Sequence, residues 1–499
     1  MKLPKSYYNL LSFSGSVVAL ISLLIMAFLA IVSYYFDDMT SYLGLFIYIV
    51  FPVFLVIGLL LIPIGMFISK RKLNKSYNIL AGKSWPVIDM NEAKYRNAFI
   101  VFSFGTVIFI FLSGIGSYQA LHYSESVQFC GLLCHQVMEP EYVAYQNSSH
   151  AKVTCAECHV GDGADWFVRS KLSGLRQVKA VITGDYSRPI NTPIKHLRPA
   201  QETCEKCHWP EKFYSHKTRY FKHFLSDSLN TEWNIALQMK IGGEHSVNGL
   251  SEGIHWHINP NVKIEYIPKR DNRKDIKWVR YTNLETGKVI VYQDTIKPLK
   301  KKKLEAAVPR LMDCMDCHNR PSHHFLTPME FIDNALISGK ISKDLPFIKK
   351  IAMDVLKDPY ESQDSAMHHI ANIFAYYQEN HPEFTMNKDN KVTRSISAIQ
   401  EEFSKHIFPS MNASWDVYPN HLGHKVYKGC FRCHSGFHVS ESGKSISNEC
   451  NLCHNLVLQG ENDKITYAPI NDNLEFQHPI DINKEWVGGS CVDCHRYLY

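Results

Sequence analysis

Cysteine and histidine occur in this sequence in one repeated pattern. All 14 cysteines fall into seven close pairs, and a histidine follows each pair directly. Six pairs read CxxCH, and the first reads CxxxCH. Two thiols at this spacing can add to the two vinyl groups of a porphyrin, and the adjacent histidine can then bind iron beneath the ring. The motifs are Cys130, Cys134 and His135; Cys155, Cys158 and His159; Cys204, Cys207 and His208; Cys314, Cys317 and His318; Cys430, Cys433 and His434; Cys450, Cys453 and His454; and Cys491, Cys494 and His495.

Paired cysteines also occur in structural zinc sites, in disulfides and in thiol redox sites, and a single CxxC would favour those readings. The repetition argues for heme, because histidine makes up only 25 of 499 residues and yet follows all seven pairs. We therefore predict seven covalently bound hemes c, with the seven motif histidines as proximal iron ligands. Because bacteria attach heme c outside the cytoplasm, residues 130–499 are expected in the periplasm.

Each iron has a second axial position, and 18 of the 25 histidines remain once the seven motif histidines are set aside. Bis-histidine ligation closes an iron to substrates and makes the heme a relay, whereas an open iron permits chemistry on a small molecule. Any single candidate can instead be a surface or hydrogen-bonded histidine, and the sequence does not separate these cases heme by heme. The candidate distal ligands are Met138, His150, His223, His255, His257, His323, His324, His421, His424, His438 and His478.

The first motif differs from the other six. It has one extra residue between its cysteines, and Met138 lies three residues beyond His135. Either side chain can be the iron ligand at this motif. A methionine in an apolar position is ordinarily a packing residue, so the ligand role of Met138 competes with that ordinary role.

Three stretches without charged residues precede the motifs, at residues 6–36, 39–69 and 97–121. Each exceeds the roughly 20 apolar residues that a membrane-spanning helix needs. Pro52 and Pro63 lie in the second stretch and are expected to kink it. We predict three transmembrane helices, the third of which leads almost directly into the first motif.

A cleavable signal peptide is the alternative reading of the first stretch. Its length, and the lack of a small-residue cleavage pattern before Asp37, argue against that reading. The positive-inside rule places the basic ends of these segments in the cytoplasm and the turn with Asp37 and Asp38 in the periplasm. This agrees with the heme argument and predicts a multi-pass protein of the bacterial inner membrane. The basic residues are Lys2 and Lys5, then Lys70, Arg71, Lys72, Lys75, Lys83, Lys94 and Arg96.

The expected fold class is a membrane-anchored multiheme cytochrome c, mainly α-helix and loop, with a small antiparallel β insert. Residues 262–294 alternate between apolar and polar around a Glu-Thr-Gly turn, and they are the one strong strand signal. Residues 325–408 read as amphipathic helices. The predicted domains are 1–121, the membrane anchor; 122–225, with hemes one to three; 226–325, with the sheet and heme four; and 326–499, with hemes five to seven.

Charge gives little information about partners. The formal net charge is +6, and the basic residues are spread along the chain, which argues against a nucleic-acid partner. The run Lys300 to Lys303 reads as a solvated linker, with an acidic partner or anionic lipid as the alternative. The oligomeric state is left open, a homo-oligomer included.

The chain resembles the NapC/NirT family of membrane-anchored quinol-oxidising cytochromes across roughly Gly116 to Phe213. The resemblance rests on the segments FCGLLCHQVMEPEYVAYQNSSHAKVTCAECHVGDGADWFVRSKLSG and RPAQETCEKCHWPEKFY. Family members usually have one anchoring helix and four or five hemes. Three helices and seven hemes resemble the heptaheme inner-membrane cytochromes of bacteria that respire extracellular acceptors.

The resemblance implies oxidation of menaquinol at the outer face of the membrane, beside the first heme. In related proteins a methionine after the first motif ligates that heme, and a lysine after the second motif contacts quinol. Met138 and Lys171 are the nearest counterparts here and are the candidate catalytic residues. The position of the methionine and the CxxxCH spacing both depart from the family pattern. For the acidic residue of the family's quinol site, Asp162 and Asp165 are merely nearby.

These inferences lead to one hypothesis and two alternatives. The hypothesis is an inner-membrane menaquinol dehydrogenase that passes electrons from the quinone pool to a periplasmic cytochrome or reductase in anaerobic or extracellular respiration. The first alternative is a terminal reductase of a small oxyanion at an open heme. The second is an electron-carrying subunit of a larger respiratory complex, which receives electrons from a partner.

Overall fold

The structure is a computed structural model, and it divides into two compact units. The first unit comprises Met1–Met138 and Thr154–Ala156, and the second comprises Glu139–Val153 and Glu157–Tyr499. The predictions about Lys2, Asp37, Asp38, Lys83 and Asp162 fall outside the described residues. The structure describes residues 5–35, 50–75, 89–161, 163–194, 198–213, 215–242, 253–386, 389–469, 472–487 and 489–496.

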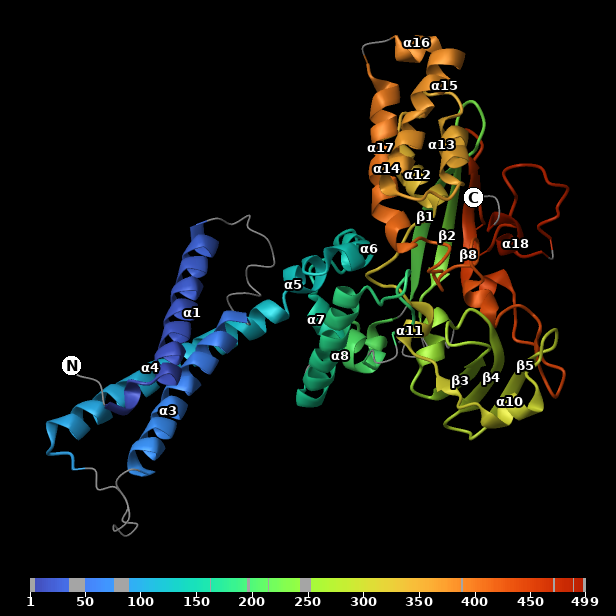
Figure 1. The fold of residues 1–499 in the computed structure, drawn as a ribbon. Helices are drawn as coiled ribbons and strands as arrows, with labels where there is room; N and C mark the ends of the chain where they lie inside the picture. The colour runs from blue at the N-terminus through green and yellow to red at the C-terminus, as the bar shows by residue number, and fades with distance from the viewer. Residues whose placement is uncertain are drawn as a thin grey trace. The chain divides into compact units, whose positions relative to one another are not determined.

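Three long apolar helices dominate the first unit: α1 (Leu10–Tyr35), α3 (Phe51–Lys75) and α4 (Ala93–Ser124) (Figure 1). Their spanning segments have mean hydropathies of 2.3, 2.7 and 2.4 and are long enough to cross a membrane. The three predicted transmembrane helices are therefore confirmed. Pro63 lies inside α3, while Pro52 lies in its first turn, where the helix needs no backbone N–H donor.

Small residues bring α1 and α3 into close contact. A Cβ atom on Gly58 would lie 2.6 Å from the backbone nitrogen of Ala19, and one on Gly15 would lie 2.7 Å from the carbonyl oxygen of Gly58. The buried hydroxyl of Ser12 donates to the carbonyl oxygen of Ile62 at 2.9 Å. Close backbone approach of this kind is how helices associate in lipid, where burial of apolar surface gives no advantage.

A four-stranded antiparallel sheet in the second unit was not predicted. Its order is β1-β2-β8-β9, with β1 (His216–Phe224), β2 (Glu232–Lys240), β8 (His454–Glu461) and β9 (Thr466–Tyr467). The strand β1 is a mostly exposed edge strand that is rich in polar residues, so it shows no apolar alternation. The strand β2 pairs on its inner side with β8, which lies far along the chain. Strands of three predicted domains share this sheet, and the domain boundaries themselves stay predictions.

The predicted sheet over residues 262–294 is confirmed as part of a five-stranded antiparallel sheet. Its order is β6-β3-β4-β5-β7. Ile264, Tyr266, Ile276 and Val279 form its buried core. The short strand β7, which follows the fifth motif, adds a C-terminal edge to it. The strands are β3 (Val262–Pro268), β4 (Ile276–Asn283), β5 (Val289–Asp294), β6 (Arg310–Leu311) and β7 (His438–Ser440).

The amphipathic segment after residue 325 forms the predicted layer of helices, and α12 of this layer contacts β1 (Figure 1). Phe331, Ile332, Tyr377 and Phe403 are at most 1% exposed and form its core. Thr327 begins the layer with a capping box, because its side chain accepts from the backbone of Glu330 and the Glu330 side chain accepts in return. The helices are α12 (Pro328–Ile337), α13 (Ile348–Leu356), α14 (Gln363–Ala371), α15 (Ile373–Asn380), α16 (Pro382–Thr385) and α17 (Lys391–His406).

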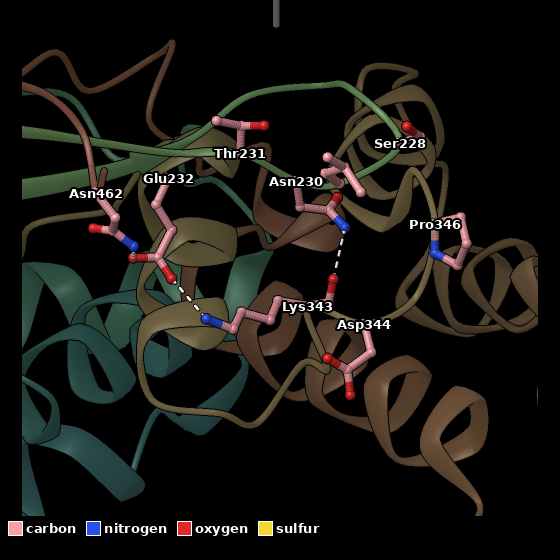
Figure 2. A pocket seen from close by; sticks show the side chains of 9 residues that line it. Ser228, Asn230, Thr231, Glu232, Lys343, Asp344, Pro346 and Asn462 are labelled. Atoms are coloured by element: carbon pink, nitrogen blue, oxygen red, sulfur yellow. Dashed lines mark hydrogen bonds and ion pairs between the residues drawn. The ribbon is translucent and has the colours of Figure 1, made fainter. Parts of the chain in front are cut away.

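A polar pocket of about 360 Å³ lies where the turn between β1 and β2 meets this helical layer (Figure 2). Glu232 and Lys343 form an ion pair of 2.9 Å on its wall. The Asn230 side chain donates to the carbonyl oxygen of Lys343 at 3.0 Å. No attachment-motif residue lines this pocket, and its polar groups already bond one another. We therefore interpret it as a contact between sheet and helices.

Short helices carry most of the remaining chain. The longest of them, α8, follows the second motif, and α10 covers the lysine run that was read as a linker. They are α5 (Val127–Leu132), α6 (His135–Gln146), α7 (Cys155–His159), α8 (Ala164–Thr183), α9 (Ala200–Thr203), α10 (Lys301–Ala306), α11 (Cys314–Cys317) and α18 (Cys491–His495), with 3₁₀ turns η1 (Lys5–Tyr7), η3 (Cys204–Lys206), η4 (Pro210–Lys212), η5 (Ile254–Ile258), η6 (Pro409–Met411), η7 (Gly429–Arg432) and η8 (Cys450–Leu452).

Candidate heme centres

Six attachment motifs occupy a single helical turn each. Motifs two, four and seven form α7, α11 and α18, and motifs three, five and six begin in η3, η7 and η8. Residues three apart on such a turn lie on one side, so the two thiols of a CxxC motif can reach one porphyrin. Motif one instead spans the end of α5 and the start of α6, and His135 is the first residue of α6.

Six of the seven motif histidines face a second histidine from elsewhere in the chain. The ring centres of these pairs are 5.8 to 6.5 Å apart, and their interplanar angles range from 5° to 79°. In each pair, the histidine from elsewhere in the chain is one of the predicted distal candidates. The pairs are His159 with His323, His208 with His150, His318 with His255, His434 with His257, His454 with His424 and His495 with His478.

This spacing fits one iron between each pair of rings. A metal-bound imidazole nitrogen lies about 2.0 Å from the metal and about 1.2 Å from its own ring centre, so two rings on opposite sides of one ion have centres about 6.4 Å apart. Rings in direct stacking contact can come closer, as Phe213 and His255 do at 4.3 Å. The six pairs therefore hold the separation that a shared metal ion requires.

Backbone carbonyl groups orient five of the histidines that face a motif histidine. His255, His257 and His478 donate from Nδ1 to the carbonyl oxygens of Ile241, Ile254 and Ile480 at 2.7 to 2.8 Å. His323 does the same to Glu141 at 3.0 Å, and His150 to Pro321 at 3.3 Å. A proton held on Nδ1 leaves the lone pair on Nε2, which is the atom a heme iron would bind.

Burial lowers the pKa of several of these imidazoles and so favours the neutral form, which metal ligation requires. Burial, with a smaller contribution from His424, lowers the pKa of His454 to about 4. Burial and the charge of Lys425 likewise lower the pKa of His495 to about 4. The Nδ1 atoms of His424 and His454 are buried and have no hydrogen-bond partner in the described part of the chain. These groups fit a pair of imidazoles arranged for iron.

Four other candidate histidines face no motif histidine in the part of the chain that the structure describes. His223 bonds Asp333 at 3.1 Å, and His438 donates from Nε2 to the carbonyl oxygen of Ile276 at 3.1 Å. His324 lies 3.0 Å from the amide of Asn420. Nδ1 of His421 lies within 3.1 Å of both Arg432 and the carbonyl oxygen of Asp316. Their contacts are those of hydrogen-bonded structural histidines.

The first motif lacks such a pair. Within the described residues, no second histidine ring faces His135, which is exposed at the start of α6. Met138 is half-buried one helical turn later, on the same side of α6. The structure thus separates the first motif from the other six.

Neighbouring motifs contact each other through their cysteines. The thiol of Cys155 hydrogen-bonds to that of Cys130, and the thiol of Cys204 to that of Cys314. Thiols of the later motifs lie within electrostatic range of one another: Cys317 of Cys430, Cys430 of Cys453 and Cys450 of Cys491. Motifs three to seven therefore form a continuous row in the order of the sequence.

Two contacts join the chain between the first and second motifs to the segment just beyond the fourth motif. His150, which faces the third motif, bonds the backbone just beyond the fourth motif. Arg320, also beyond the fourth motif, forms a buried ion pair of 2.9 Å with Glu141 on α6. The sequence analysis missed both Arg320 and Glu141, because a long-range ion pair leaves no local pattern.

Lys171 lies on α8, half-buried, with Nζ 5.0 Å from the centre of the Phe167 ring. Asp165 is exposed in the first turn of the same helix. Lys171 belongs to the second compact unit, whereas His135 and Met138 belong to the first. The pairing of Lys171 with Met138 at one site stays a prediction.

Comparison with known proteins agrees with the motif geometry. Residues 91–219 match the family described as NapC/NirT cytochrome c family, N-terminal region. Over 494 residues the chain is 41% identical to the cytochrome c-type protein ImcH of Geobacter sulfurreducens, covering 98% of this chain and 95% of that relative. The chain belongs to the NapC/NirT cytochrome c family.

A second NapC/NirT relative matches a shorter region. The cytochrome c-type protein NrfH of Wolinella succinogenes is 30% identical over 124 residues, which cover 24% of this chain and 68% of that protein. No solved structure matches the chain. The region shared with the family model contains the first three motifs and α8.

Family membership establishes the general role of this NapC/NirT cytochrome. It carries covalently bound heme c and takes part in electron transfer. It is a multi-pass protein of the inner membrane with its heme region in the periplasm, as predicted. When bound, heme c supplies an iron that takes up and releases one electron at a time.

Proposed function

We propose that this chain is a heptaheme menaquinol dehydrogenase. It oxidises menaquinol beside its first motif and passes the electrons along its row of motifs to a periplasmic cytochrome or reductase. One observation supports this most strongly. Six motif histidines face a second histidine, whereas His135 of the first motif faces none among the described residues. A heme between two histidines has no open iron position and is suited to passing electrons on. A motif without the second histidine is suited to contact with a substrate.

The row of motifs supports the relay part of this proposal. The cysteines of consecutive motifs are neighbours from the third to the seventh, so an electron that reaches the third motif has a continuous route to the seventh. Oxidation of one quinol releases two electrons and two protons. The electrons leave singly along the row, and the protons are released on the periplasmic side.

Two residues of the chain are assigned roles at the quinol end. Lys171 binds the quinol oxygen, and its charge favours loss of the quinol proton. Met138 sets the properties of the first iron, either as its ligand in place of His135 or by packing beside it. The axial ligand identity alone can move a heme potential over about 0.8 V, so this choice matters for the first electron-transfer step.

The alternative functions predict different ligation. A terminal oxyanion reductase needs an open iron with a substrate site, and the six facing pairs leave only the first motif for it. A subunit that receives electrons from a protein partner needs no quinol contact at Lys171. Both alternatives are therefore distinguishable from quinol oxidation by testing that lysine.

The test is stopped-flow reduction of the detergent-solubilised protein by a menaquinol analogue, with and without a quinone-site inhibitor. We expect rapid, inhibitor-sensitive reduction of the wild-type protein and at least tenfold slower reduction of Lys171→Ala, a loss of about 1.4 kcal/mol of transition-state stabilisation or more. Lys179→Ala is the matched control, because Lys179 is an exposed lysine of the same helix. Equal rates in the two variants would contradict the assignment of Lys171.

A further inference from the structure

Arg432, within the fifth attachment motif, holds the fourth motif through hydrogen bonds. It is 8% exposed, and its Nη2 donates to the carbonyl oxygen of Asp316 at 2.6 Å. Its Nε donates to the carbonyl oxygen of Gly429, directly before its own motif, at 2.9 Å, and its Nη1 donates to the carbonyl oxygen of Arg273 at 3.1 Å. Each nitrogen of the guanidinium group thus has a partner, which makes its burial tolerable.

Asp316 is equally well held within the fourth motif. It is 1% exposed, and its carboxylate accepts from Tyr266 at 2.6 Å, from Arg273 at 2.7 Å and from Arg310 at 3.1 Å. The backbone N–H of Asp313 donates to the same carboxylate at 2.9 Å, which closes a capping box around α11. The carbonyl group that Arg432 binds therefore has a fixed position.

Arg432 and Asp316 occupy the same place in their two motifs, directly before the second cysteine. The thiol of Cys317 lies within electrostatic range of those of Cys430 and Cys433. The two attachment turns are thus adjacent, and the guanidinium group joins them. Arginine suits this link between two turns because its planar guanidinium group holds several hydrogen bonds in a fixed geometry. A lysine side chain is flexible and carries its charge on one atom.

A buried arginine that bonds backbone carbonyls is most often a contact that stabilises the fold. Two observations distinguish Arg432 from that ordinary case. Its bond to Asp316 runs between two attachment turns, and in each turn the residue that makes this bond directly precedes a cysteine that would hold a heme. A displacement of either turn would change the separation of the two cofactors, on which electron transfer depends steeply.

We propose that Arg432 is a positioning residue that fixes the hemes of the fourth and fifth motifs relative to each other. The inference rests on the proposed attachment of a heme at both motifs. It assigns Arg432 no contact with a reacting group. The side chain acts by holding Cys430 and Cys433 against the turn that contains Asp316.

The test compares Arg432→Gln, Arg432→Lys and the control Lys277→Met in the full-length, heme-loaded protein. Lys277 is also a buried cation of the second unit, paired with Asp294 at 2.5 Å, and it contacts no attachment motif through that pair. Three quantities are measured: the number of covalent hemes by mass spectrometry, the Soret circular-dichroism couplet that reports heme–heme coupling, and the unfolding midpoint.

We expect Arg432→Gln to keep all seven hemes and to lose part of the Soret couplet. Arg432→Lys keeps the positive charge but not the planar guanidinium group, so it should lose the same part of the Soret couplet. This variant tests the proposal even if the glutamine variant fails to fold. Lys277→Met should lower the unfolding midpoint and leave the couplet unchanged. An unchanged couplet in the arginine variants, or an equal loss in Lys277→Met, overturns the proposal. A wild-type mass with fewer than seven hemes refutes the heme count instead.

Discussion

The rings of His255 and His318 lie within 5° of parallel, with their centres 6.5 Å apart. One residue belongs to the turn η5 and the other follows directly after α11. Nothing in the local sequence of either residue specifies the other. Their spacing nevertheless matches that of five further histidine pairs, and it is the spacing of two imidazoles that bind one metal ion.

His255→Ala should open one iron without releasing its heme. The cysteines of the fourth motif still attach the group, and only the distal imidazole is removed. We expect one additional heme per protein that binds carbon monoxide, measured by difference spectroscopy, with an unchanged mass. His438→Gln serves as the control, because His438 is 2% exposed and bonds a backbone carbonyl instead of facing a motif. No gain in carbon monoxide binding by His255→Ala would show that the pair does not share an iron.

Glu232 should make the second unit sensitive to acid. Burial opposes its charge, but hydrogen bonds from Lys222, Lys343 and Asn462 outweigh this and lower the pKa from 4.5 to about 2. A carboxylate with a lowered folded-state pKa stabilises the fold above its unfolded-state pKa and loses that effect as pH falls. The contribution is therefore complete above about pH 4.5 and disappears towards about pH 2.

Glu232→Gln should reduce stability at pH 7 by about 1–2 kcal/mol, because the lysine partners are largely exposed and their ion pairs are screened. The measurement is the guanidinium midpoint by far-ultraviolet circular dichroism at several pH values. The difference between wild type and variant should shrink as pH falls below 4.5. A difference that stays constant down to pH 2 would rule out the carboxylate as its cause.

Gly58→Leu should separate α1 from α3. A side chain there collides with the backbone of Ala19 and the carbonyl oxygen of Gly15, both closer than 3.0 Å, and overpacking of this kind costs about 1–3 kcal/mol. We expect less folded protein after heating in detergent, measured by gel filtration. Gly114→Leu on α4 is the matched control, because no atom of the described chain lies within 4 Å of a Cβ at that position. Equal heat resistance of the two variants would mean that the contact is unimportant.

The sequence alone determined the features whose cause is local. Attachment of heme requires only two thiols and a histidine on one turn, so the seven motifs can be recognised from the sequence. Membrane insertion depends on the length and polarity of a continuous segment, and the three helices α1, α3 and α4 appear where uncharged stretches predicted them. The strands β3, β4 and β5 followed from apolar alternation around one turn.

Only the tertiary structure decided which histidines face the motifs. The sequence offered ten histidines and Met138, and the fold brings six of those histidines opposite a motif while it binds four others into hydrogen bonds. The sequence likewise did not predict that β2 pairs with β8 or that Arg432 bonds Asp316. Each joins residues far apart in the chain, and such contacts depend on how whole elements pack, for which no local pattern exists.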